Sequence, residues 1–190
     1  MTDFSPSPTF HGVFDADAEQ TLYFFVDVKT PGPETWAAVL SALEPLRQKQ
    51  YLSSSDGETF TSRPVTVIGT GNTPLAVVEY MLPRYAFFDA PVHLLNTEFS
   101  NITAQISPIA STDFANVFGD VRTELGEKEL EVLKKQVGEA HEKGIKVRYW
   151  NQPSWPVGTR NRVWKQLWEG GVDFLNVDDL RGCAEFWEGQ

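Results

Sequence analysis

Residues 22–29 read Leu-Tyr-Phe-Phe-Val-Asp-Val-Lys, and this run decides the fold class. Its aromatic and β-branched residues are nearly continuous, which is typical of a strand buried on both faces of a parallel sheet. Pro31-Gly32-Pro33 then interrupts the chain, and apolar residues recur at helical spacing over residues 35–50. A buried strand, a turn and an amphipathic helix predict the first βα unit of an α/β fold.

The same alternation continues along the chain. Further strands are predicted at 65–71, 86–89, 102–107, 145–150 and 172–176, and further helices at 74–80, 127–143, 161–169 and after Asp179. Residues 108–125 carry no clear pattern. Because strands alternate with helices, they are expected to pair in parallel through right-handed crossovers. About six strands leave two architectures open, a doubly wound sheet and a (β/α)8 barrel. No linker or repeat divides the chain, so one domain over residues 1–190 is expected.

Composition limits the classes of partner. The 190 residues carry a formal net charge of −10, with 41% hydrophobic and 13% aromatic residues. This predicts a globular protein and disfavours nucleic acid and anionic membranes as partners. A phosphate substrate remains open, because carboxylates bind divalent cations that bind phosphate in turn. No signal peptide and no apolar run of ~18 residues is found, which predicts a soluble chain without a membrane span and leaves its compartment unknown. No specific protein partner is predicted.

Asp27 and Lys29 are the first candidate site residues. In an α/β fold, functional side chains gather at the carboxyl ends of the strands. These two residues lie two apart at the end of the first predicted strand, so strand alternation places them on one face. They could form a structural salt bridge, or an acid–base pair that works without metal. They could also form a site in which the carboxylate binds a hard cation and the ammonium neutralises phosphate.

Other strand ends offer weaker candidates. Trp150 ends the strand at 145–150, where it could fill the core or form an aromatic wall for a ligand. Asn176 ends the strand at 172–176, where an amide can orient a substrate. Asp178 and Asp179 are expected to cap the helix that follows. Residues 69–72 read Gly-Thr-Gly-Asn and are interpreted as a strand-end turn, because they lack a complete phosphate-loop motif.

The three histidines are not expected to be catalytic. His11, His93 and His141 are the only histidines of the chain, and none lies in an acid-flanked motif at a strand end. His141 falls near the end of a predicted helix, where a cation favours the helix dipole.

Several segments carry a family resemblance. The longest are Phe-Phe-Val-Asp-Val-Lys-Thr at 24–30, Lys-Val-Arg-Tyr-Trp-Asn at 146–151 and the run from Gly171 to Gly182, and shorter ones lie at 34–36, 63–67, 69–72, 153–156 and 160–161. Together they resemble the fungal altered inheritance of mitochondria phosphodiesterase-like proteins. That family is similar to the phospholipase C-like and glycerophosphodiester phosphodiesterase barrels. The resemblance spans nearly the whole chain, and its motifs are specific in combination rather than singly.

The resemblance implies a fold, an activity and a site. The fold would be a (β/α)8 TIM barrel of the phospholipase C-like phosphodiesterase type. The activity would be metal-dependent hydrolysis of phosphoric diesters in lipid metabolism, on a small glycerophosphodiester or a lysophospholipid. Asp27 would bind Mg²⁺ or Ca²⁺, and Lys29 would be a catalytic residue that contacts the phosphate. Trp150 and Asn176 would bind substrate.

One departure from the family pattern qualifies these expectations. The family's two catalytic histidines and its Glu-x-Asp metal strand precede its Asp-x-Lys strand, and residues 1–21 contain none of these motifs. An incomplete barrel is therefore expected, truncated at its N-terminus, with about six of the eight strands. Such a chain would bind the cation weakly or not at all, since Mg²⁺ requires near-octahedral oxygen coordination. The alternative function is an inactive barrel that binds a phosphate ligand at most.

Overall fold

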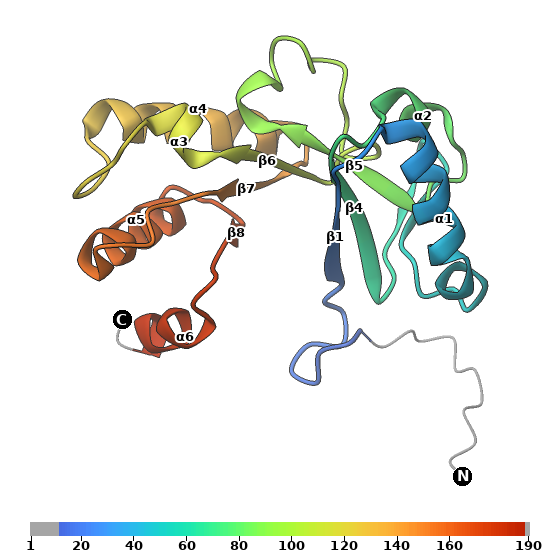
Figure 1. Cartoon of the computed structure of the whole chain (residues 1–190), viewed down its shortest axis with the longest axis horizontal. Coiled ribbons are helices and arrows are strands. Elements are labelled where there is room, and N and C mark those ends of the chain that lie inside the picture. The colour runs from blue at the N-terminus through green and yellow to red at the C-terminus, as the bar shows by residue number, and fades with distance from the viewer. Residues whose placement is uncertain (1–11, 189–190) are drawn as a thin grey trace. The chain divides into compact units, whose positions relative to one another are not determined.

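The computed structural model describes residues 12–188, which divide into two compact units. The first unit runs to Asp89 and includes Gln105–Ser107, and the second comprises Ala90–Ala104 and the residues from Pro108 onward. Each unit contains parallel strands of its own (Figure 1). Each also contains buried side chains. Among residues 12–188, no helix has the length and apolar character that crossing a bilayer requires.

The first unit is built on three parallel strands with β4 in the middle. Its elements are β1 (Leu22–Val28), α1 (Gly32–Gln48), β2 (Ser54–Ser55), β3 (Phe60–Thr61), β4 (Val65–Gly71), α2 (Leu75–Tyr80) and β5 (Ala86–Pro91), whose last residues cross the unit boundary. Leu22 pairs with Val65 and Val67 pairs with Ala86, while β2 and β3 form a small antiparallel hairpin.

Helix α1 packs onto the strands through one aromatic side chain. Trp36 is 1% exposed and lies in an apolar cluster with Val28, Leu43 and Val67. A Cβ added at Gly69 of β4 would lie 2.6 Å from the Trp36 ring, so the glycine lets the indole approach the strand. The helical spacing of Trp36 and Leu43 therefore marks the face that α1 buries, as the sequence predicts.

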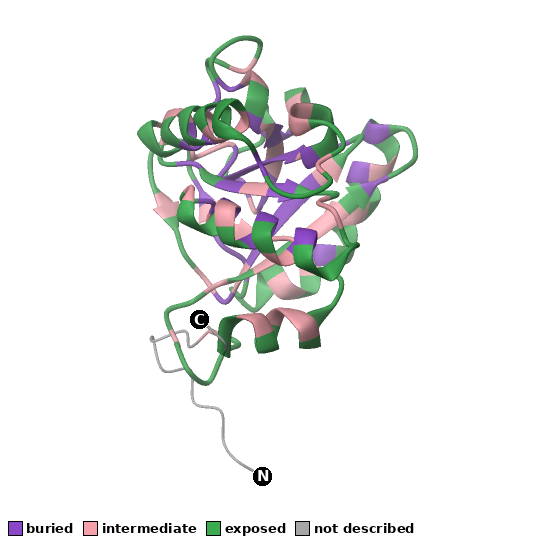
Figure 2. Ribbon diagram, turned by 90° about the vertical axis from the view of Figure 1, so that its left-hand side faces the viewer, coloured by how far each residue is buried: buried purple, intermediate pink, exposed green. Residues whose placement is uncertain are grey.

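The second unit also has three parallel strands, in the order β6–β7–β8. Its elements are η1 (Val92–Leu94), β6 (Ile109–Asp113), α3 (Phe114–Phe118), α4 (Glu127–Glu142), β7 (Lys146–Trp150), α5 (Val157–Glu169), β8 (Phe174–Leu175) and α6 (Leu180–Glu188). Buried residues follow the strands, and exposed residues cover the outer sides of the helices (Figure 2). Tyr149 of β7 is fully buried, and its hydroxyl donates to Gln136 Oε1 of α4 at 2.7 Å.

The predicted architecture is wrong, although the α/β class is confirmed. The sequence predicts a (β/α)8 TIM barrel of the phospholipase C type with about six of its eight strands, and in the complete barrel every strand has a neighbour on both sides. The described residues contain six parallel strands, three in each unit. Within residues 12–188, β1 pairs only with β4 and β8 pairs only with β7. Five of the six predicted strands are thus real, but the pairing of the described strands does not form the predicted barrel.

Two local predictions also differ from the structure. β1 is not buried on both faces, since Phe24 is 48% exposed. The strand predicted at 102–107 is a series of turns. Residues 108–125, for which the sequence showed no clear pattern, contain β6 and α3. β6 was not predicted, because its residues Ile-Ala-Ser-Thr-Asp include no continuous run of bulky apolar side chains. By contrast, α1, α2, α4, α5 and α6 are confirmed with bounds shifted by a few residues.

Candidate functional site

Asp27 and Lys29 lie together at the carboxyl end of β1. Lys29 Nζ is 2.7 Å from Asp27 Oδ2, and the two side chains are 80% and 49% exposed respectively. The predicted proximity of the two groups is therefore observed, and the pair is a salt bridge at the rim rather than in the core. Exposed ion pairs of this kind typically contribute less than about 1 kcal/mol to stability. Both charged groups are open to a ligand from solvent.

The end of β4 shapes the backbone around this pair. Gly71 has φ +66°, and a Cβ at this position would lie 2.5 Å from Asp27 Oδ1 and 2.6 Å from the Val28 carbonyl oxygen. The Asn72 amide donates to the Val28 carbonyl at 2.7 Å, and the Asn72 side chain donates to the Thr30 carbonyl at 3.3 Å. The turn after β4 thus holds the end of β1, and a side chain at Gly71 would displace the Asp27 carboxylate.

The described residues supply only part of a metal site. No group of three or more His, Cys, Asp or Glu side chains within residues 12–188 is arranged to hold a metal ion. Asp27 offers one carboxylate, which Lys29 already neutralises. Mg²⁺ is commonly bound by one or two carboxylates, with water and substrate phosphate as its other ligands. Asp27 therefore fits one position in such a coordination shell, and the described residues do not complete it.

In the second unit, the ends of β6 and β7 are tied together by Asp113. Asn151, at φ 61°, donates through Nδ2 to both carboxylate oxygens of Asp113 at 3.0 and 3.1 Å. Asp113 also caps α3 by accepting from the amides of Ala115 and Asn116. Sequence reasoning missed Asp113, although an Asp directly before Phe-Ala-Asn is a helix-start signal.

Asn176 and Trp150 lie at strand ends of this unit, as predicted, but in different surroundings. Asn176 Oδ1 accepts a hydrogen bond from Arg148 Nη2, and Asn176 lines a polar hollow of about 330 Å³ together with Asn151 and Arg160. Trp150 is half-exposed at the end of β7 and is not among the residues that line this hollow. Their proposed roles toward substrate stay predictions.

Arg160 was missed by sequence reasoning and organises one wall of the hollow. Its side chain is 10% exposed, lies 4.4 Å over the Trp164 ring, and pairs with Asp179 Oδ2 at 2.6 Å. Asp179 also accepts from the Gly182 amide at 2.8 Å, so it caps α6 as predicted. The Gly182 amide and then the Arg160 guanidinium lower the pKa of Asp179. No sequence signal linked Arg160 to Asp179, because the two lie 19 positions apart.

The described histidines have structural contacts in the second unit. His93 Nδ1 and Thr112 Oγ1 form a hydrogen bond of 2.9 Å. His141 Nε2 lies 2.8 Å from Asp173 Oδ2. His11 is outside the described residues. That these residues are not catalytic stays a prediction.

Known proteins are similar in sequence to this chain over most of its length. Residues 1–89 match the family described as AIM6-like phosphodiesterase domain. A homolog of altered inheritance of mitochondria protein 6 from Arthroderma benhamiae is 42% identical over 97% of this chain and 59% of its own length. The proteins of that name from Eremothecium gossypii and Lachancea thermotolerans are 33% and 32% identical, over 93% and 90% of this chain and 49% and 45% of their own lengths. The chain thus spans about half the length of these relatives. No solved structure matches it.

Proposed function

Because this chain belongs to the family of AIM6-like phosphodiesterase proteins of fungi, we propose that it takes part in the hydrolysis of phosphoric diesters, with Asp27 and Lys29 at the reacting phosphate. The observation that carries this proposal is the accessible ion pair at the end of β1. It lies within residues 1–89, the part that matches the phosphodiesterase family. Lys29 is one residue beyond the strand and mostly exposed, so it can turn from Asp27 toward an anionic ligand.

The two side chains have complementary roles in this proposal. Lys29 offsets the negative charge of the phosphate as the ester bond breaks, and a well-placed charge of this kind is worth a factor of about 10²–10³ in rate. Asp27 holds the ammonium in place before substrate binds and offers one oxygen ligand to Mg²⁺ or Ca²⁺. The cation, when bound, would supply further neutralisation of the phosphate oxygens. The proposed substrate is a small glycerophosphodiester or a lysophospholipid.

A second candidate function is phosphate binding without hydrolysis. Two observations favour it. The described residues include no cluster of three metal ligands, and His93 and His141 are engaged by Thr112 and Asp173. In that case Lys29 would bind a phosphate group, and no group at the site would move the protons that ester hydrolysis requires.

Hydrolysis and binding are measured separately on the purified chain. Hydrolysis of glycerophosphodiesters and lysophospholipids is followed with Mg²⁺, with Ca²⁺ and with excess chelator, and inorganic phosphate binding is followed by calorimetry. Asp27→Asn and Lys29→Met are expected to lower kcat/KM by about 10²-fold or more. Lys29→Met removes the positive charge that offsets the phosphate, and Asp27→Asn removes the carboxylate that holds Lys29 and offers a ligand to the cation. Activity that survives chelation would support the metal-free acid–base alternative for Asp27 and Lys29.

The matched control is the pair Arg181–Glu185 on α6. Its charged atoms are also 2.7 Å apart and its side chains are exposed. Glu185→Gln and Arg181→Met should leave hydrolysis unchanged. Phosphate binding that depends on Lys29, without turnover, would select the second function. Wild-type hydrolysis in both Asp27→Asn and Lys29→Met would remove these residues from the site.

A further inference from the structure

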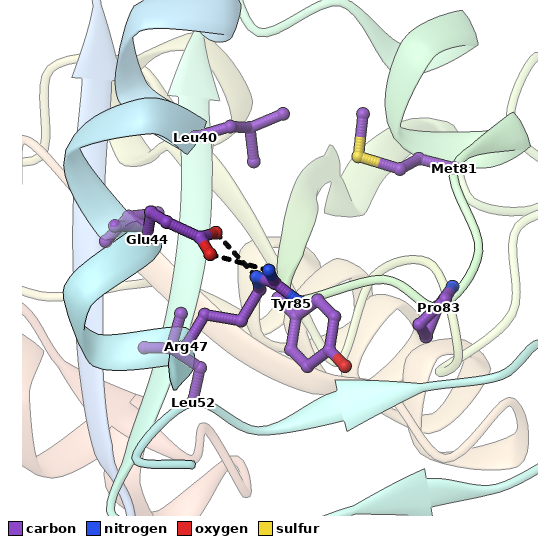
Figure 3. A pocket seen from close by; sticks show the side chains of 8 residues that line it. Leu40, Glu44, Arg47, Leu52, Met81, Pro83 and Tyr85 are labelled. Atoms are coloured by element: carbon purple, nitrogen blue, oxygen red, sulfur yellow. Dashed lines mark hydrogen bonds and ion pairs between the residues drawn. The ribbon is translucent and has the colours of Figure 1, made fainter. Parts of the chain in front are cut away.

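The first unit contains a cavity that the proposed hydrolysis does not use. It has a volume of about 300 Å³ and lies between α1 and the segment that joins α2 to β5 (Figure 3). Its walls are mainly apolar and consist of Leu40, Leu43, Leu52, Met81, Pro83 and Tyr85. Leu40 and Met81 face each other across the space from opposite sides (Figure 3).

This cavity lies at the amino ends of the strands. Leu52 bridges to Val65, the first residue of β4, and Tyr85 directly precedes β5. Glu44 and Arg47 belong to the last turns of α1. Asp27 and Lys29 lie at the carboxyl end of β1, the opposite end of the same unit. A ligand in the cavity would therefore not occupy the position proposed for the phosphate.

One ion pair provides the charged groups of the cavity. Arg47 donates through Nε and Nη2 to the two oxygens of Glu44, each at 2.6 Å, and its guanidinium lies 5.5 Å from the centre of the Tyr85 ring. The side chains of Arg47 and Glu44 are 45% and 38% exposed, so solvent reaches both. Hydrogen bonding to Glu44 raises the pKa of Arg47, and the guanidinium is charged at neutral pH with or without this contact. A solvated carboxylate such as Glu44 can give way to another carboxylate with the same planar geometry.

We propose that this cavity binds a single-chain anionic amphiphile, with its alkyl chain against the leucines and its carboxylate at Arg47. Small-molecule sites range from about 300 to 1,000 Å³ and combine apolar walls with a few polar groups at defined positions. The cavity is at the lower end of this range, which suits one chain rather than two. Its charged lining residues, Glu44 and Arg47, are neighbours on α1, so the ligand has one charged end. This proposal stands independently of the proposed hydrolysis.

The chain length of the ligand provides the first test. Binding of the straight-chain carboxylates from hexanoate to tetradecanoate is measured by calorimetry below their micelle-forming concentrations. Each methylene that enters the cavity should tighten binding roughly fourfold, from about 0.8 kcal/mol per buried methylene. Affinity should stop rising once the chain fills the cavity. Affinity that does not change with chain length, or that rises without limit, would overturn the proposal.

Four variants test the geometry, with decanoate and decanol as probes. Arg47→Gln should weaken the binding of decanoate by about tenfold and leave the affinity for decanol unchanged, as expected for loss of a charged hydrogen bond. Glu44→Gln should have the opposite effect and tighten decanoate, because it removes the competing carboxylate. Met81→Trp should fill the cavity and abolish binding of both probes. Tyr80→Trp is its matched control, because Tyr80 is the adjacent residue, is exposed and does not line the cavity.

The same variants identify the result that would contradict the proposal. Circular dichroism and the urea midpoint confirm that each variant is folded. Equal affinity in Met81→Trp and Tyr80→Trp would place the ligand elsewhere. Weakening by both Glu44→Gln and Arg47→Gln would mean that the intact ion pair, rather than the free guanidinium, forms the site, and would overturn the role given to Arg47. If the wild-type chain binds neither probe, the proposal is also refuted. The remaining candidate occupant would then be an apolar side chain of another protein.

Discussion

Replacement of Gly71 by alanine tests how the fold positions Asp27. Gly71 ends β4 at φ +66°, a conformation that side-chain-bearing residues rarely adopt. The added methyl would lie 2.5 Å from Asp27 Oδ1 and 2.6 Å from the Val28 carbonyl oxygen. Both distances are well below van der Waals contact. The backbone of β1 or the Asp27 side chain must therefore move.

Gly144→Ala separates the two costs of this substitution. Gly144 has φ +70°, and a methyl there would meet only Ala104 Cβ, at 3.7 Å, which is an ordinary contact. Gly144→Ala should thus lower the free energy of unfolding only by the cost of the left-handed backbone conformation, about 1–2 kcal/mol. Gly71→Ala should add about 1–3 kcal/mol of overpacking, for a total of about 2–5 kcal/mol. Because Asp27 is displaced, Gly71→Ala should also reduce diester hydrolysis more than Gly144→Ala does.

Hydrogen exchange measures the loss of stability that each substitution causes within its own unit. Peptides that cover β4 report the first unit, and peptides that cover β7 report the second. The Asn72 amide is the most direct probe, because it donates to the same Val28 carbonyl that the new methyl approaches. If Gly71→Ala costs no more than Gly144→Ala, and Asn72 stays protected, the end of β4 does not position Asp27 as described.

Two further predictions concern pH. Because the pKa of Asp179 is lowered in the folded chain, its stabilisation is present above its ordinary value near 3.9 and is lost as the pH falls below it. Hydrogen exchange of α6 should therefore accelerate in acid, and Asp179→Asn should show fast exchange already at pH 7. Burial raises the pKa of Tyr149, so its contribution is present below about pH 10 and is lost above it. Urea titrations should show an alkaline loss of stability that Tyr149→Phe diminishes, at a cost of about 1 kcal/mol near pH 7 from the lost hydrogen bond to Gln136.

Local elements of this fold could be predicted because their signals are local. β4 runs from Val65 to Gly71 as its apolar run and glycines indicate, and α4 begins at Glu127 as its periodicity predicts. Closure of the sheet could not be predicted in the same way, because strand pairing depends on residues far apart in the chain. Six strands fit a barrel and an open sheet equally well. The family resemblance favoured the barrel, and the pairing of the described strands contradicts it.

The candidate site was predictable to the same extent. Strand alternation places Asp27 and Lys29 on one face, and they are in contact. Their position at a rim rather than in a core follows from the exposure of β1, which the apolar sequence did not indicate. Asp113 and Arg160 were missed for different reasons. Asp113 belongs to an unrecognised strand, whereas the burial of Arg160 arises only when Asp179 and Trp164 are brought to it.

Burial separates the roles of three ion pairs that have nearly the same length. Lys29–Asp27, Arg47–Glu44 and Arg160–Asp179 have closest distances of 2.7, 2.6 and 2.6 Å. The Arg160 side chain is 10% exposed although its partner Asp179 is 53% exposed, so removal of Asp179 leaves an almost buried guanidinium without its counterion, and stability falls. Lys29 and Arg47 keep their contact with water, so loss of the partner costs little stability. A second anion can replace the first partner at these two positions at low cost, and binding of phosphate by Lys29 or of a carboxylate by Arg47 requires this exchange.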